Sequence, residues 1–211
     1  MVSIAKTTEE YIKGHPGIRE CFRAGLINYS ALTRKIATDL GLDAKKDFDA
    51  ILIACRRYFS KVKKEPLADN KILEVLKNSK LEVKNKVIDI IVEKNVFFNN
   101  LLDLQKEVKK REERFNIIEG TKTITMITSM EFLDYIKKLF KKKIIKVYDH
   151  LAEVIIKSSN NLIETPGVVA YLSTLLAENG INIIEIMSSY TDTLIVINEK
   201  DIAKVMDVLS I

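Results

Sequence analysis

The sequence predicts an α+β protein in which an all-helical N-terminal domain precedes two successive units of the order strand, helix, strand, strand, helix. Two observations support this. Apolar residues recur at helical spacing through residues 1–65. The element order deduced for residues 80–149 recurs in residues 150–211, which is the pattern of an internal repeat. Residues 66–79, with Pro66, are predicted to form the linker between the helical domain and the first unit.

The N-terminal domain is predicted to contain three or four helices. Thr7 or Thr8 is expected to cap a short helix that the His15-Pro16-Gly17 stretch interrupts. A second helix is expected to follow a cap at Asn28-Tyr29-Ser30 and to stop at Gly41. A long helix from about residue 47 to 64 carries an apolar face that includes both a phenylalanine pair and Cys55. The central stretch SALTRKIATDLGL resembles a helix-turn-helix, a common DNA-binding motif.

Basic residues of this domain leave two interpretations open. The chain has a net charge of +5, yet residues 151–211 carry three Lys/Arg against eight Asp/Glu, so the positive charge lies in the rest of the molecule. A cluster on the predicted helices could contact phosphates without choosing a sequence, or could simply solubilise the helix ends. The candidate nucleic-acid-binding residues are Arg34, Lys35, Arg56, Arg57 and Lys61.

The last sixty residues contain the strongest local signals. Thr165 is a good N-cap and Pro166 suits the first helical position, while Gly167 allows close backbone approach. Asn179-Gly180 predicts the end of this helix. A β-branched run then predicts a strand, followed by a polar turn and a second strand over 193–197. Because free N–H groups point outward from a helix start, this loop is a candidate carboxylate-binding site.

The internal repeat is marked by the match between Phe115-Asn-Ile-Ile-Glu119 and Ile181-Asn-Ile-Ile-Glu185, about 66 residues apart. Two such units are expected to form one continuous antiparallel sheet with helices on one face, which covers strand edges. The first unit lacks a Thr-Pro-Gly loop and has Glu93-Lys-Asn-Val-Phe97 instead. One competent ligand site per chain is therefore expected.

The stretch Thr165–Asp192, TPGVVAYLSTLLAENGINIIEIMSSYTD, resembles ACT domains, and most closely the regulatory tail of aspartate kinases without the kinase domain. The resemblance implies ferredoxin-like βαββα(β) modules, with a degenerate one at 80–149 and a full one at 150–211, and a homodimer formed through them. It implies an amino-acid effector, with lysine, threonine or methionine as first candidates. The effector-binding residues that it implies are Asn161, Glu164, Thr165, Gly167, Val168, Val169, Asn182 and Ile183.

Enzymatic chemistry and cofactors are not indicated by the sequence. The two histidines and two cysteines have no partners at metal-ligand spacing, and no phosphate-binding glycine motif is present. No apolar run is long enough for a membrane span, and a cytoplasmic protein is expected. Two function classes remain: an amino-acid-responsive regulator whose helical domain acts on DNA or docks on protein, or a free-standing regulatory subunit of an amino-acid biosynthetic enzyme. Gly167→Asp is expected to abolish ligand binding while leaving the fold largely intact.

Overall fold

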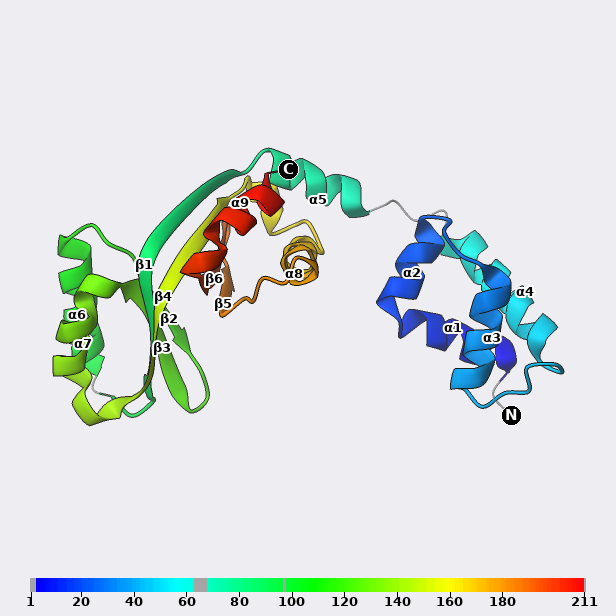
Figure 1. Ribbon diagram of the computed structural model, residues 1–211, viewed down its shortest axis with the longest axis horizontal. Coiled ribbons are helices and arrows are strands. Elements are labelled where there is room, and N and C mark those ends of the chain that lie inside the picture. Colours follow the sequence, from blue (N-terminus) through cyan, green and yellow to red (C-terminus); the bar gives the residue numbers. More distant parts are fainter. Residues whose placement is uncertain (1–2, 63–67, 97, 211) are drawn as a thin grey trace. The chain divides into compact units, whose positions relative to one another are not determined.

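The computed structural model describes residues 3–62, 68–96 and 98–210 and divides into two compact units, Met1–Ala68 and Asp69–Ile211 (Figure 1). The predicted boundary residue Pro66 and the predicted helix start at Phe97 lie outside the described residues.

The first unit is helical, as expected. Its helices are α1 (Ile4–Lys13), α2 (Pro16–Arg23), α3 (Tyr29–Asp39) and α4 (Phe48–Val62). The hydroxyl of Ser3 caps α1 by accepting from the Lys6 amide at 3.2 Å, so the cap lies upstream of the predicted Thr7 or Thr8. Asn28 caps α3 as predicted, accepting from the Ala31 amide at 3.0 Å. A core of apolar side chains forms between these helices, with Ile12, Phe22, Ile36, Ile51 and Cys55 fully buried.

The helix-turn-helix expectation is not confirmed. The SALTRKIATD stretch forms the single helix α3, and residues 40–47 connect it to α4. A helix-turn-helix joins its two helices by a turn of about three or four residues, which this connection exceeds.

The second unit is built on a curled sheet of six antiparallel strands, which confirms the antiparallel sheet expected from the sequence. Its strand order is β2-β3-β1-β4-β6-β5. The strands are β1 (Lys80–Glu93), β2 (Phe115–Glu119), β3 (Thr123–Ser129), β4 (Ile144–Lys157), β5 (Glu185–Ser188) and β6 (Asp192–Asn198).

Helices cover the sheet in two groups (Figure 1). In the first half, α6 (Phe98–Lys110) and α7 (Leu133–Phe140) pack on alternate side chains of β1 and β3, such as Ile90 and Met126. In the second half, α8 (Val168–Glu178) and α9 (Ile202–Leu209) pack on β4 and β6. Helix α5 (Ala68–Lys77) joins this second core through Ile72, Val75 and Leu76. Residues predicted as a linker therefore form a packed helix.

The two long strands run through both halves of the sheet. Lys80 at the start of β1 lies opposite Lys157 at the end of β4, and Val92 lies opposite Ile144. Each strand bends at a bulge where one residue has a positive φ, Lys86 (54°) in β1 and His150 (53°) in β4. The first part of β1, from Lys80, therefore pairs with the end of β4 in the second half of the sheet. The first part of β4, from Ile144, pairs with the end of β1 in the first half.

The order of strands and helices in residues 80–149 recurs in residues 150–211. The two matching five-residue sequences, however, do not occupy equivalent positions in this order. Asn116 lies opposite Ile127 on β3, and Glu185 occupies the corresponding place opposite Val196 on β6. Structurally equivalent residues of these strands are therefore 69 positions apart. The matched Ile181-Asn-Ile-Ile-Glu185 segment lies three residues upstream of its structural counterpart, and β5 begins only at Glu185.

The helix-free face of the curled sheet has its own apolar cluster, formed by Val87, Ile127, Leu151 and Val196. Ile118 of edge strand β2 and Met187 of edge strand β5 pack against it. Two carboxylates are buried on the same face, Asp89 and Glu153. The helix-free face therefore buries two acidic side chains beside an apolar cluster to which both halves of the sheet contribute.

Candidate ligand-binding site

The loop between β4 and α8 has a geometry that only glycine adopts readily. Gly167 is the N-cap residue of α8 and has a φ of 96°, in the left-handed region. Thr165, predicted as the cap, instead donates its hydroxyl to the Asn161 carbonyl oxygen at 2.7 Å. This bond closes the turn that follows the short 3-10 helix Asn160–Leu162. The helix start predicted at Pro166 thus lies at Val168.

Helix α5 lies over this loop. A Cβ atom built on Gly167 would come within 3.2 Å of the Ile72 Cδ1 atom, which is tighter than ordinary van der Waals contact. Gly167→Asp is therefore expected to strain the fold as well as the loop, and it is not the clean test of binding that the sequence suggested. A polar groove of about 340 Å³ separates α5 from the loop; it is lined by Lys71, Glu74, Val75, Asn78, Ser159, Asn161, Glu164 and Thr165.

The structure brings together only part of the predicted effector-binding set. Asn161, Glu164 and Thr165 share the groove, while Val168 turns into the core and Val169 is 38% exposed. Asn182 and Ile183 follow the other end of α8, an eleven-residue helix about 16 Å long. Within one chain, these two residues do not face the loop.

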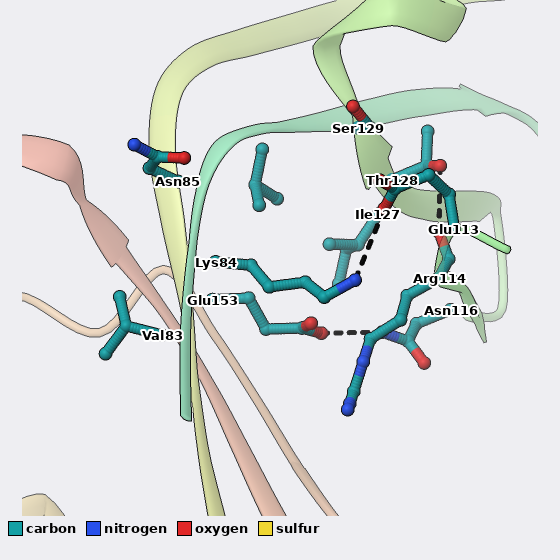
Figure 2. A pocket seen from close by; sticks show the side chains of 11 residues that line it. Val83, Lys84, Asn85, Glu113, Arg114, Asn116, Ile127, Thr128, Ser129 and Glu153 are labelled. Atoms are coloured by element: carbon teal, nitrogen blue, oxygen red, sulfur yellow. Dashed lines mark hydrogen bonds and ion pairs between the residues drawn. The ribbon is translucent and has the colours of Figure 1, made fainter. Parts of the chain in front are cut away.

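A second polar pocket, not anticipated from the sequence, lies at the helix-free face near the bend of β1. Figure 2 shows Lys84 and Glu153 reaching from β1 and β4 toward Glu113 and Asn116. Lys84 and Glu153 lie opposite each other in the β1–β4 pair. The cavity measures about 240 Å³ and is lined by Val83, Lys84, Asn85, Val87, Glu113, Arg114, Asn116, Ile127, Thr128, Ser129 and Glu153.

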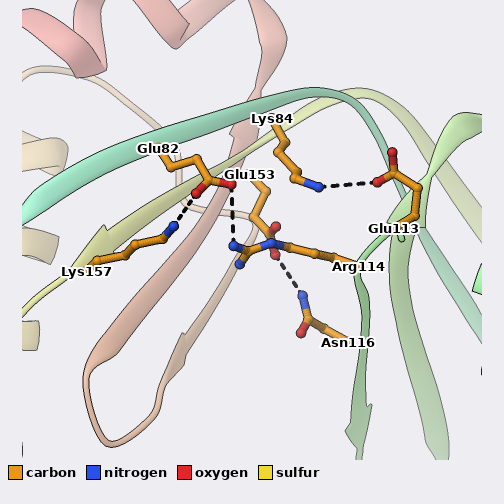
Figure 3. Close-up of polar contacts among 7 residues, drawn as sticks. All are labelled: Glu82, Lys84, Glu113, Arg114, Asn116, Glu153 and Lys157. Atoms are coloured by element: carbon orange, nitrogen blue, oxygen red, sulfur yellow. Dashed lines mark hydrogen bonds and ion pairs between the residues drawn. The ribbon is translucent and has the colours of Figure 1, made fainter. Parts of the chain in front are cut away.

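Ion pairs surround this pocket (Figure 3). The Lys84 ammonium lies 3.3 Å from Glu113, and the Arg114 guanidinium lies 3.4 Å from Glu82. Glu82 also pairs with Lys157. Each of these groups is about one third exposed or more, so the pairs contribute little to stability individually.

Glu153 differs from its neighbours because it is buried, with 2% of its surface exposed. Its Oε1 accepts a hydrogen bond from the Asn116 amide at 2.7 Å. Burial raises the pKa of the Glu153 carboxyl, and the nearby charges of Arg114 and Lys84 oppose that rise. No sequence pattern predicted this pocket, because its residues come from four strands and the adjoining turns.

The predicted nucleic-acid-binding residues lie on α3 and α4 of the helical unit. Lys35 pairs with Asp39 at 2.9 Å, and Lys61 pairs with Glu9 at 3.4 Å. Two of the five candidate cations are therefore partly neutralised within the unit. Arg34, Arg56 and Arg57 are exposed.

Neither metal nor membrane chemistry is indicated in the described part of the chain. Within residues 3–62, 68–96 and 98–210, no group of three or more His, Cys, Asp or Glu side chains could hold a metal ion. None of the helices described there has both the length and the hydropathy that a bilayer span requires.

Comparison with known proteins finds a family match in the second half of the sheet unit. Residues 146–210 match the family model of the ACT domain. No curated protein sequence matches the chain.

Solved structures of aspartate kinases are similar to part of this chain. Aspartate kinase from Clostridium acetobutylicum aligns with a TM-score of 0.51 and 15% identity over 61% of this chain and 33% of the enzyme. A structure of aspartokinase alpha and beta subunits aligns with a TM-score of 0.51 and 17% identity, over 64% of this chain and 95% of that one. Aspartate kinase from Synechocystis gives 0.50 and 16%, over 64% of this chain and 26% of the enzyme.

These likenesses concern the fold. The chain spans about a third of the Clostridium enzyme, and no kinase catalytic domain is indicated.

Proposed function

We propose that this chain is an amino-acid-responsive regulatory protein, in which the sheet unit binds a free amino acid and the helical unit acts on a protein partner. The observation that carries the proposal is the ACT domain at residues 146–210, whose β4–α8 loop borders a polar groove. Lysine, threonine and methionine are the first candidates for the ligand. A homodimer is the proposed assembly, because Asn182 and Ile183 could approach the loop only from another chain.

We further propose that residues 80–149 are a second, degenerate ACT-type module. The support is the shared element order and the matched bends at Lys86 and His150. The structural neighbours cover 61–64% of the chain, about twice the length that the family model matches. The β1–α6 connection has no counterpart of Gly167, and one loop site per chain follows.

Helix α5 is the element through which ligand binding at the loop would influence the helical unit. It follows directly on the residues that join them, and Ile72 contacts the loop at Gly167. A ligand in the groove would touch α5 and the loop together. If the ligand bound more tightly with α5 in one of two positions, that difference in binding free energy would be available for signalling.

A thermal-unfolding screen against the twenty amino acids at millimolar concentration tests the sensing role. A ligand at about a hundred times its dissociation constant adds about 2.7 kcal/mol to the folded state. For a chain of this size, a rise in Tm of roughly 5–10 °C is expected. Twenty flat curves would contradict amino-acid sensing.

Retention on heparin tests whether the partner of the helical unit is protein or nucleic acid. Because Lys35 and Lys61 are already paired with acids, weak retention at low salt is expected. Strong retention that falls steeply with salt would instead indicate a phosphate-bearing partner.

A further inference from the structure

The polar pocket beside Glu153 carries charges of both signs in a small space that is open to solvent on one side. Its volume of about 240 Å³ corresponds to roughly eight waters of liquid volume, so it fits a small metabolite and not a nucleotide. Lys84 and Arg114 supply positive charge, and Glu113 and Glu153 supply negative charge. A ligand that complements such a pocket has one cationic and one anionic group a few bonds apart.

Among the described residues, no cation contacts the negative end of the pocket directly, although Arg114 and Lys84 lie near enough to oppose the rise in the pKa of Glu153. Glu153 is buried, and its Oε1 accepts a hydrogen bond from Asn116. Among the described side chains, no lysine, arginine or histidine nitrogen lies within 4.0 Å of this carboxylate. Buried carboxylates ordinarily require a paired charge as well as hydrogen bonds. A ligand ammonium group would supply that charge.

The positive end of the pocket keeps hydrogen-bonding capacity. Arg114 contacts Glu82 through its Nη2 atom, whereas a guanidinium carries five N–H donors. Arginine binds carboxylates through two parallel hydrogen bonds, which fixes the orientation of the bound group. The Arg114 backbone is held by the Thr128 hydroxyl, which donates to its carbonyl oxygen at 2.9 Å. The guanidinium therefore extends from an anchored position on the pocket wall (Figure 2).

We propose that this pocket binds the zwitterionic head group of a free amino acid, with the ammonium on Glu153 and the carboxylate on Arg114. The inference rests on the proposed amino-acid-sensing function and assigns it a site that is separate from the β4–α8 loop. Asn116 positions the Glu153 carboxylate. The ligand would lie between the two halves of the sheet, where β1, β2 and β4 all contribute to its surroundings.

The test begins with the amino acid that gives the largest Tm shift in the wild-type protein, whose Kd is then measured by titration calorimetry. Glu153→Gln is expected to weaken binding at least tenfold, and Arg114→Gln likewise. Glu178→Gln, a matched loss of one exposed carboxylate at the end of α8, is expected to leave the Kd within about twofold. The N-acetyl and amide derivatives of the same amino acid, which lack one charge each, should bind the wild type at least tenfold more weakly.

The outcomes separate the two proposals. Binding that survives Glu153→Gln but is lost in Glu164→Gln overturns the pocket and leaves amino-acid sensing intact. No Tm shift with any of the twenty amino acids overturns both. If the variants fail to fold, amide NMR shifts of the wild type on ligand addition decide the matter. Shifts centred on Asn116 and Ser129 support the pocket, and shifts centred on Glu164 and Gly167 overturn it.

Discussion

Two equivalent positions on the helix-free face of the sheet have opposite electrostatic character. In one, Glu153 of β4 faces Asn116 of β2, which donates a hydrogen bond to it. In the other, Asp89 of β1 interacts with Glu185 of β5, which raises the pKa of the Asp89 carboxyl further. Asn116 and Glu185 occupy matching places on their strands. The fold thus repeats the positions while the side chains give only one of them a charge-balanced environment.

The difference shows that two matching positions in one sheet can carry different chemistry. Burial raises the pKa of Asp89 to about 6, and no hydrogen bond satisfies its Oδ1 in the described structure. Its partner Glu185 has its own pKa raised by burial. The Glu153 position instead has Arg114 and Lys84 close by and opens into a cavity. A buried carboxylate can therefore form part of a binding site when cationic side chains and a cavity lie next to it, and burial alone is not sufficient.

The largest effect is expected from making the two positions alike. Asn116→Asp removes the donor to Glu153 and puts a second carboxylate beside it, which should lower the free energy of unfolding by roughly 2–3 kcal/mol at pH 7.5. Asn116→Ala, which only removes the hydrogen bond, should cost about 1 kcal/mol. Urea unfolding of both variants at pH 7.5 and pH 5 provides the measurement. Equal losses for Asp and Ala at pH 7.5 would show that the two charges do not interact.

Neutralising the other position should raise stability. The folded-state pKa of Asp89 is about 6, above the value of about 3.9 in an unfolded chain. The wild type therefore gains stability from this group as the pH falls through 6 toward 4. Asp89→Asn should add about 2 kcal/mol to the free energy of unfolding at pH 7.5, about a third of that at pH 4.5, and almost nothing at pH 3. A pH-independent difference in urea unfolding would contradict this assignment.

A substitution in the β4–α8 loop, at Gly167, should lower stability by a smaller amount. Gly167→Ala forces a side chain onto a residue with a φ of 96° and against Ile72, at an expected cost of about 1–2 kcal/mol. Gly17→Ala is the matched control, since nothing lies within 4 Å of its added Cβ and its φ is not positive. That control should be neutral or slightly stabilising in thermal unfolding. Equal Tm values for the two variants would remove the special role of Gly167.

The smallest effect concerns the two bends. Lys86 and His150 are both exposed and have nearly the same positive φ. Glycine relieves the backbone strain but gains entropy in the unfolded chain, so the two effects nearly cancel. Lys86→Gly and His150→Gly should each change the free energy of unfolding by less than about 0.5 kcal/mol, with the same sign. Opposite signs at pH 8 would mean that the bends are not equivalent.

The sequence predicted the local features of this protein better than the long-range ones. Asn28 and Gly180 marked helix ends because capping and left-handed conformations depend on neighbouring residues. The element order of the sheet unit also followed from hydrophobic periodicity. By contrast, the start of β1 at Lys80 depends on pairing with β4, which lies far along the chain and leaves no local sequence signal.

The pocket and helix α5 were missed for different physical reasons. Glu153 becomes buried only when β2 and β4 come together, and no local pattern encodes that meeting. Helix α5 did have a local signal, because Ile72, Val75 and Leu76 follow helical spacing and form one apolar face. Pro66 and the polar residues after it favoured a linker instead. The pair of Lys61 with Glu9 could not be anticipated, because the two residues are far apart in sequence, whereas Lys35 and Asp39 have the i, i+4 spacing of a helical ion pair.

The exchange of strand segments between β1 and β4 constrains how the protein can be made. During synthesis, Lys80 emerges from the ribosome long before Lys157, its partner in the sheet. One edge of β1 stays unpaired until residues 144–157 have been translated, because β4 is its neighbour on that side. Neither half of the sheet can be completed before then. Contacts this distant along the chain slow folding and expose unpaired edges. A nascent chain stalled between residues 130 and 144 should therefore be the species most dependent on chaperones.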